Sequence, residues 1–411
     1  MNKLILAVTI AVPSAAYAGG YFIPNETARD LALSESAVAN QHGAEAVFLN
    51  VSALAGQDSV DVSANGELLV LDSNWSDPTL GRSSLVSEPN FPPAGAVSYG
   101  DKLPNGMAWG IGAGALVSGG SSLTWPNAWQ GQEAVQSVSQ QVFQYGLGAA
   151  LQPLPFFKVG ASVLRYRTIE DLHQSINFLD HYGDAHLGMT GDATTFGLGV
   201  EVAIPDTPLT LAATYKHSAD MTLSGDVHFT DVPMQFSPTI HDQGVTQKIT
   251  IPSDTYVGAA YRITPDVTAT FAVNYERWNV YKSDTFVGTD GFMVSVPRDY
   301  NNAYAFRGGV EWQRMPFLRA LTLRGSAMRS ISDQPTDTIS PSLTDASSTV
   351  VGVGAGYHVG RTLRIDLGYQ HAFFDSVTAT GDAFPGTYKS RADLLSLGLN
   401  WRSDLGFLRG E

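Results

Sequence analysis

The sequence predicts an all-β protein, a transmembrane antiparallel up-and-down β-barrel of about 14 strands. Apolar and polar residues alternate in successive short segments from residue 58 to residue 402. The connections between these segments are alternately short and long, which is typical of barrels in the bacterial outer membrane. After residue 18, no stretch reaches the roughly 18 apolar residues that a membrane-spanning helix requires. A closed barrel crosses lipid with every backbone group hydrogen-bonded, so the two observations agree.

The composition excludes several other classes of protein. The chain has 411 residues, 44% hydrophobic and 15% charged, with a net charge of −15 and no cysteine. The missing cysteines exclude a disulfide scaffold and a thiolate metal site, and the acidic balance argues against a nucleic-acid partner. His217, His228, His241 and His371 show no metal-ligand spacing. We therefore expect no metal and no cofactor.

An enzyme is the alternative to a transport protein, and a membrane hydrolase would be its form. The chain contains no G-x-S-x-G motif, and no serine and histidine are paired in a distinctive spacing. We therefore expect no catalytic residues.

Residues 1–18 have the pattern of a secretory signal peptide. Lys3 supplies the positive charge, residues 4–12 form the apolar segment, and residues 16–18 read Ala-Tyr-Ala, a small-x-small cleavage site. The mature chain is therefore predicted to begin at Gly19.

Residues 19–57 do not follow the strand pattern, and we expect them to form a plug, or hatch, inside the barrel. A barrel of about 14 strands is too wide to fill its own interior with wall side chains. The segment is too polar to span a membrane, and residues 25–41 suit short helices. The alternative is a disordered periplasmic tail, but residues 21–23 and 47–49 are too apolar for one.

The barrel itself is predicted to span residues 58–402, followed by a C-terminal periplasmic tail at residues 403–411. In residues 363–373, one face carries Leu363, Ile365, Leu367, Tyr369 and Phe373, and the other carries Arg364, Asp366, Gly368 and Gln370. This period of two places the two sets on opposite faces of a strand, with the apolar set toward lipid. Strands are predicted near residues 58–71, 93–101, 106–117, 136–151, 156–169, 191–204, 208–228, 247–263, 267–282, 300–313, 318–331, 346–358, 361–378 and 389–402.

Short connections follow the even-numbered strands and long ones the odd-numbered strands. With the N-terminus on the periplasmic side, the long connections lie outside the cell. An exported soluble β-sandwich, the alternative fold, has no reason to keep this alternation.

Several motifs, taken in order, resemble the FadL/TodX family of outer-membrane transporters for long-chain fatty acids and hydrophobic aromatic compounds. The resemblance covers almost the whole mature chain. The motifs lie at residues 46–54, 214–218, 251–278, 332–345 and 386–390.

The chain also departs from the family pattern. Val51 and Ser52 stand where the family has a proline after Asn50, and no aromatic residue ends the chain. The loop at residues 171–190 is shorter than in fatty-acid members. Asn301 and Asn302 occupy a place that is basic in many of those members, with Arg298 nearby. Fatty acids and aromatic hydrocarbons both remain possible substrates.

The resemblance implies a set of substrate-binding residues. Arg167 matches a basic position that holds a ligand carboxylate, and an arginine can bind a carboxylate through two hydrogen bonds. The alternative is an ion pair inside the lumen with Glu170 or Asp171. At the start of the plug, three apolar residues are expected to touch the ligand; they are Tyr21, Phe22 and Ile23.

Two apolar groups are expected in extracellular loops. The resemblance implies that the first forms part of an outer capture groove; it comprises Leu172, Ile176, Phe178 and Leu179. The second comprises Trp125 and Trp129, for which an aromatic girdle at the membrane interface is the preferred interpretation.

Glycines crowd the third predicted strand. The resemblance implies an inward kink there that opens a lateral exit, and the alternative is that the glycines make room for the plug. The glycines are Gly110, Gly112, Gly114, Gly119 and Gly120. A dinucleotide motif is excluded because no helical pattern follows.

The predicted function is that of a passive channel in the bacterial outer membrane for hydrophobic small molecules, with long-chain fatty acids preferred over monoaromatic hydrocarbons. Loops would capture the ligand, an internal pocket would hold it, and it would leave sideways. A general diffusion porin and an adhesive surface barrel are the alternatives. The expected partners are the ligand, outer-membrane lipids and lipopolysaccharide, and we expect a monomer.

Overall fold

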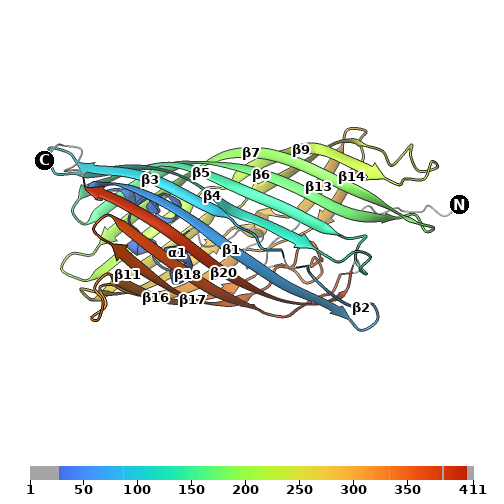
Figure 1. Ribbon diagram of the computed structural model, residues 1–411. Helices are drawn as coiled ribbons and strands as arrows, with labels where there is room; N and C mark the ends of the chain where they lie inside the picture. The colour runs from blue at the N-terminus through green and yellow to red at the C-terminus, as the bar shows by residue number, and fades with distance from the viewer. Residues whose placement is uncertain (1–26, 87, 333, 382–383, 405–411) are drawn as a thin grey trace.

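The protein is a closed antiparallel β-barrel (Figure 1). The computed structural model describes residues 27–86, 88–332, 334–381 and 384–404. Within these residues, 14 strands form the wall, and β20 pairs along its length with β1 to close it. In their order around the barrel, the wall strands are β1 (Ser59–Asp77), β3 (Pro93–Lys102), β4 (Ala108–Thr124), β5 (Ser137–Leu154), β6 (Phe157–Asn177), β7 (Tyr182–Ala203), β8 (Leu209–Lys216), β11 (Asp254–Thr264), β12 (Val267–Glu276), β15 (Ala303–Trp312), β16 (Leu321–Ile331), β17 (Ser348–Val359), β18 (Leu363–Phe374) and β20 (Gly386–Asp404). The predicted fold class is confirmed.

Further strands extend the wall at the end that carries the long connections. They are β2 (Gly81–Ser84), β9 (Ala219–Thr230), β10 (Gln243–Ile251), β13 (Ser283–Gly288), β14 (Met293–Pro297) and β19 (Val377–Ala379), and a short 3-10 helix, η3 (Trp278–Val280), precedes β13. One half of β7 pairs with β8 and the other half with β9. Pro252 separates β10 from β11 because proline lacks the N–H that a ladder needs. Three of the predicted strands, at residues 208–228, 247–263 and 361–378, are each two strands in the structure.

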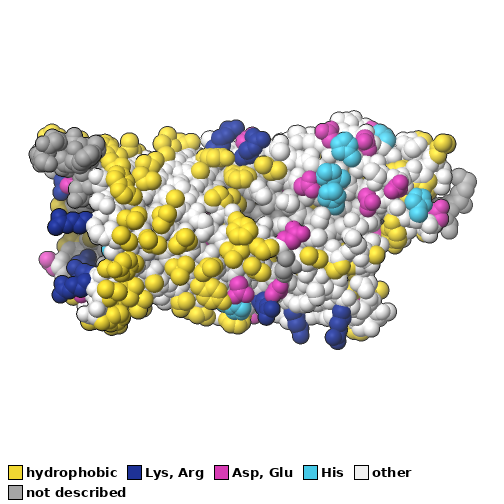
Figure 2. Space-filling model, in the orientation of Figure 1, with side chains coloured by type: hydrophobic (Ala, Val, Ile, Leu, Met, Phe, Trp, Pro, Cys, Tyr) yellow, Lys and Arg dark blue, Asp and Glu magenta, His cyan; other side chains and the backbone are white. Residues whose placement is uncertain are grey.

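The outer surface has an apolar half and a polar half. Figure 2 shows hydrophobic side chains over the half where β1 begins and β20 ends, and acidic and histidine side chains over the other half. Outward residues of the apolar half remain accessible, among them Leu147 at 65% and Val163 at 57%. An apolar band of this kind is the lipid-facing surface of an outer-membrane barrel. In the described residues, no helix has both the length and the apolar character needed to cross a membrane.

The strands extend beyond their predicted ends at the polar half. We predicted that the fifth strand ends near residue 169 and that the sixth begins near residue 191, but β6 ends at Asn177 and β7 begins at Tyr182. Both predictions were wrong for one reason. Above the lipid band the outward side chains are polar, so the apolar signal weakens although the hydrogen-bond ladder continues.

The plug lies inside the barrel. Its helices are α1 (Ala28–Leu33), η1 (Val38–Asn40), α2 (Ala46–Leu49) and η2 (Val51–Leu54), and between them they contact all 14 wall strands. Figure 1 shows α1 within the half of the barrel that carries the apolar outer band. Residues 19–26 of the predicted plug and the predicted signal peptide lie outside the described residues. At the other terminus, Ser403 and Asp404 belong to β20 rather than to the predicted tail.

Candidate functional site

Buried ion pairs fix the plug to the wall. Arg29 of α1 lies 3.1 Å from Glu311 of β15, and Arg324 bridges Glu311 and Asp366 at 2.7 Å each. Two further pairs join Glu35 to Arg307 at 3.1 Å and Glu45 to Arg364 at 3.9 Å. The wall members of these pairs lie on the lumen face of their strands and are buried or, at Arg364, largely buried. A buried charge needs such a partner because its desolvation is costly.

The glycines at the start of β4 lie directly over the plug. An added Cβ would collide with the Leu54 carbonyl oxygen at Gly110, approach Leu54 Cδ2 to 2.9 Å at Gly112, and approach Phe48 Cε1 to 2.5 Å at Gly114. A side chain at any of these three residues would therefore force the plug to shift. Their placement fits the alternative interpretation, that they make space for the plug.

The last two glycines of β4 lie at an irregularity in the wall. The register against β5 shifts between Val117 and Gly119, as in a β-bulge. Gly120 has φ +149°, and an added Cβ there would collide with the Gln140 carbonyl oxygen. The irregularity in this strand is thus at its outer part.

The barrel wall is interrupted beside this bulge. In the described residues, β3 pairs with β4 only as far as Leu116 and with β1 only as far as Gly66. The segment that immediately precedes β3 stays beside β1. Asn90 of this segment and Leu69 of β1 exchange backbone hydrogen bonds of 3.0 and 2.9 Å. Residues 117–123 of β4 therefore have β5 as their strand partner on one side and a gap on the other.

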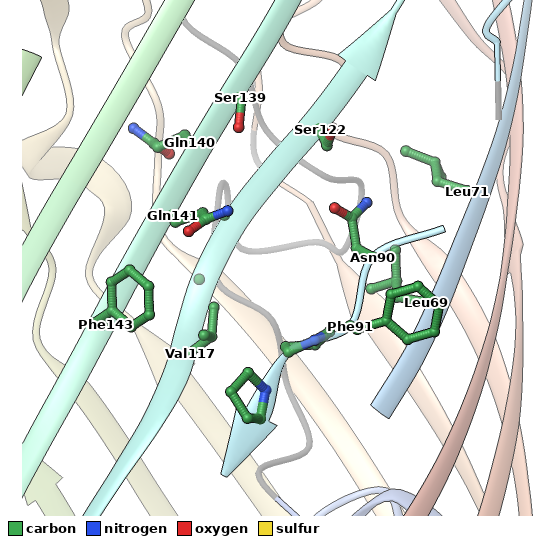
Figure 3. A pocket seen from close by; sticks show the side chains of 14 residues that line it. Leu69, Leu71, Asn90, Phe91, Val117, Ser122, Ser139, Gln140, Gln141 and Phe143 are labelled. Atoms are coloured by element: carbon green, nitrogen blue, oxygen red, sulfur yellow. The ribbon is translucent and has the colours of Figure 1, made fainter. Parts of the chain in front are cut away.

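A hollow of about 700 Å³, partly open to the surroundings, occupies this gap (Figure 3). Its lining runs from the interior to the outer surface, because Leu69 and Gln140 are 4% and 2% exposed and Phe91 is 73% exposed. None of the 14 lining residues is charged. They are Leu69, Leu71, Asn90, Phe91, Pro92, Pro93, Val117, Gly119, Gly120, Ser122, Ser139, Gln140, Gln141 and Phe143.

Sequence reasoning found only the two glycines of this hollow. Pro92 and Pro93 carried a signal for the rest, because consecutive prolines cannot donate to a ladder and so end the pairing of β3.

The interior beyond the plug is apolar rather than polar. Inward residues of β5, β6, β7, β9 and β10 form one buried cluster with aromatic residues from the loops. Its members include Trp75, Val138, Val142, Leu164, Tyr166, Leu187, Met189, Met221, Leu223, Ile251, Trp278 and Phe286. This interior differs from the polar lumen of a water-filled porin.

One pair of opposite charges is buried within this region. Arg298 and Asp284 are fully buried and form a 2.6 Å ion pair, and Arg298 also donates to the Ser340 hydroxyl at 3.2 Å. The guanidinium of Arg298, the basic residue near Asn301 and Asn302, is therefore paired with groups of the protein itself. Gln140 donates to Glu170 at 3.1 Å on the same inner face.

Trp125 and Trp129 do not form an interfacial girdle. They are 3% and 4% exposed, and their rings stack with centroids 4.2 Å apart. Both indoles donate to backbone carbonyls, Trp125 to Pro341 and Trp129 to Val135. The girdle interpretation was wrong because the loops fold over these side chains and bury them.

The predicted capture groove is not an exposed cluster. Leu172 and Ile176 face the interior from β6 and are each 4% exposed, and Phe178 is 6% exposed. Leu172 joins the large apolar cluster, whereas Ile176 and Phe178 pack with Ile240. Only Leu179 of the four is exposed, at 83%. The loop we expected here is mostly strand, which turns alternate side chains inward.

The turn that carries Leu179 is tied to the neighbouring loop by His181. One ring nitrogen lies 2.9 Å from the Asp231 carbonyl oxygen and the other 2.9 Å from Asp180. These hydrogen bonds, that to Asp231 first, raise the pKa of His181. The protonated ring, which donates from both nitrogens, is therefore the form that this turn favours.

Arg167 points outward rather than into the lumen. Its side chain is 47% exposed and lies 3.5 Å from Asp192, which also contacts Arg165 at 3.4 Å. The lumen ion pair with Glu170 or Asp171 that we considered is not formed. Tyr21, Phe22 and Ile23 lie outside the described residues.

Comparisons with known proteins agree with this architecture. The family model described as outer membrane protein transport protein (OMPP1/FadL/TodX) matches residues 9–402. A comparison with curated protein sequences gave no significant match.

Three solved structures illustrate the shared fold. A FadL homologue from Pseudomonas aeruginosa has a TM-score of 0.82 at 15% identity, covering 93% of this chain and 99% of its own. The toluene transporter TodX from P. putida has a TM-score of 0.70 at 16% identity, covering 94% and 99%. The monoaromatic hydrocarbon channel CymD has a TM-score of 0.66 at 12% identity, covering 95% and 99%.

At these identities the structures establish the fold alone, whereas the family model covers nearly the entire sequence. The family consists of transport proteins rather than enzymes. With its plugged 14-stranded barrel and its apolar outer band, the chain belongs to the FadL/TodX family of outer-membrane transport proteins.

Proposed function

We propose that this protein carries hydrophobic small molecules passively through the outer membrane and releases them sideways through the gap between β1 and β4. The observation that carries the proposal is the hollow at Gly119 and Gly120, whose lining connects the interior with the lipid-facing side. A hydrophobic molecule that reaches this gap leaves into the membrane without crossing the plug.

The apolar interior supports the inward half of this path. Val138 and Val142 belong to the buried apolar cluster and flank Gln140 on the inner face of β5, and Gln140 lines the hollow. Leu179 is the exposed member of the predicted capture groove. We propose that the ligand enters near this turn. The route lies within a single chain, which is consistent with a monomer embedded in lipid and lipopolysaccharide.

Two substrate classes suit the proposal, each for its own reason. The sequence motifs resemble those of fatty-acid transporters. The hollow, in contrast, has no charged side chain among the described residues that line it, and Arg167 points away from the lumen. Neutral molecules such as monoaromatic hydrocarbons are therefore favoured at the exit, because an unpaired carboxylate is costly to bury.

The test is uptake by bacteria that lack a transporter of this type and express either the full chain or a variant. Gln141→Trp fills the hollow, whereas Tyr145→Trp enlarges an outward residue of the same strand that does not line it. We expect Gln141→Trp to lower uptake of radiolabelled toluene or oleate several-fold and Tyr145→Trp to leave it unchanged. Equal uptake by both variants would contradict the lateral route.

The porin alternative is tested in the same system. A general diffusion porin would pass labelled sugars and conduct ions steadily in planar bilayers. The proposal predicts neither, because the plug and the apolar cluster fill the lumen of the described protein.

A further inference from the structure

Two histidines and an aspartate meet on the outer face of the barrel, above the lipid band. His173 of β6 and His186 of β7 are directly opposite in the strand register. Asp171 lies two residues before His173, so it shares the same face of β6. All three side chains are partly exposed, at 46% for Asp171, 42% for His173 and 41% for His186.

The three side chains present their donor atoms to one another. Asp171 Oδ1 lies 3.2 Å from His173 Nε2, and Asp171 Oδ2 lies 2.7 Å from His186 Nε2. The two imidazoles are stacked, with ring centroids 4.0 Å apart and planes inclined by 12°. Stacking holds both Nε2 atoms on the side of the carboxylate, and one ligand atom from each residue lies within 4.8 Å of the others.

We propose that Asp171, His173 and His186 form a surface binding site for a divalent transition-metal ion such as Zn²⁺ or Cu²⁺. Imidazole nitrogen suits these ions, whereas Mg²⁺ and Ca²⁺ prefer sites built from oxygen alone. Bonds of about 2.0–2.2 Å in a tetrahedral arrangement separate neighbouring ligand atoms by about 3.3 Å. The two Nε2 atoms lie 3.2 and 2.7 Å from the two different oxygens of Asp171, and one ligand atom from each residue lies within 4.8 Å of the others, so small side-chain shifts are enough to admit the ion. Solvent would occupy the remaining coordination position.

The backbone favours this arrangement. β6 and β7 pair continuously from Phe157 with Val202 to Asn177 with Tyr182, so the two histidines come from a regular ladder rather than from loops. The register of their Cα atoms is fixed before any ion binds. A metal ion would clip the two strands together at the extracellular end of their hairpin.

A third histidine lies next to His186 on the neighbouring strand but pairs with a different aspartate. His228 of β9 is opposite His186 in the register, yet its Nδ1 lies 3.0 Å from Asp242. The ligand set therefore stops at three. Pairs of one histidine and one aspartate also occur alone, as at His371 and Asp393, which are 2.7 Å apart. Such a pair offers one imidazole and serves as a matched control.

The experiment is a titration of the full chain in detergent, purified without a polyhistidine tag, with ZnCl₂ and separately with CuCl₂. Isothermal titration calorimetry gives the affinity, and electron paramagnetic resonance of the Cu²⁺ form counts the coordinating nitrogens. We expect one high-affinity site with two nitrogen ligands in the wild type.

His173→Ala, His186→Ala and Asp171→Asn test the assignment, and His371→Ala is the control. Residues that merely orient a ligand contribute about 10–100-fold to affinity, so loss of either histidine should weaken binding by about 100-fold or more. His371→Ala should bind like the wild type. Heat-modifiable mobility on gels confirms that each variant is folded. Absence of binding by the wild type, or binding as tight as the wild type's by His173→Ala or His186→Ala, would overturn the proposal.

Discussion

At the scale of single residues, the glycines of β4 have two separate structural roles. Gly110, Gly112 and Gly114 admit the plug, whereas Gly119 and Gly120 shape the gap in the wall. The sequence showed the row of glycines but not the boundary within it, because both roles require the same absence of a side chain.

The first prediction concerns plug packing. Gly110→Val places a side chain against the Leu54 carbonyl oxygen and should destabilise the protein by about 1–3 kcal/mol, as overpacking does in a filled interior. Gly325→Val is the control, since the nearest atom to an added Cβ there is 4.0 Å away. Urea unfolding of each variant in lipid vesicles measures the difference. Similar unfolding midpoints for the two variants would show that the plug does not press on β4.

The second prediction concerns the buried charges. Glu311→Gln leaves Arg29 and Arg324 without the carboxylate that both contact, and removing one partner of a buried pair costs about 3–5 kcal/mol. Asp72→Asn breaks the exposed pair with Arg391 and should cost less than about 1 kcal/mol. The same urea assay compares them. An effect of Glu311→Gln as small as that of Asp72→Asn would refute the anchoring role of this network.

At the scale of elements, the sequence predicted the wall strands well where they face lipid and poorly elsewhere. Alternation is strong at Leu147 and Val163 because lipid selects apolar outward side chains. It fades near His173 and His186, where the outward residues are polar, so β13 and β14 were missed, and β9 and β10 were predicted only as parts of longer strands. The hollow was missed because it depends on where the pairing of β3 stops, which is a property of neighbouring strands together.

The third prediction tests the plug as an element. Ser326 of β16 contacts the plug through Ser34 at 2.8 Å and the Ala32 carbonyl at 3.0 Å. A Ser326→Cys thiol, unique in a chain without cysteine, should react slowly with a soluble maleimide. Deleting residues 27–49 should speed the reaction several-fold, because the thiol then faces an open lumen.

Ser295→Cys on exposed β14 is the control for this deletion and should react at the same rate in both chains. A Ser326→Cys thiol that reacts equally fast with and without residues 27–49 would mean that the segment does not shield the wall.

At the scale of the whole molecule, the barrel combines a closed lumen with an open side. The plug contacts every wall strand, and the apolar cluster fills the interior beyond it, so a continuous water path is not built into the described fold. The gap between β1 and β4 gives this interior its connection to the lipid-facing surface. The central claim of the proposed function is that ligands leave through that gap.

Reversible closure of the gap tests this claim most directly. Cysteines at Asn90 and Gln141, which line the hollow from two different segments, can be joined by a bifunctional thiol reagent with a cleavable disulfide. A control pair replaces Val62 and Val97, which face each other where β1 and β3 already pair. Uptake of labelled toluene or oleate should fall several-fold only when Asn90→Cys and Gln141→Cys are joined, and it should recover on reduction. Undiminished uptake through the fully cross-linked gap would contradict lateral release.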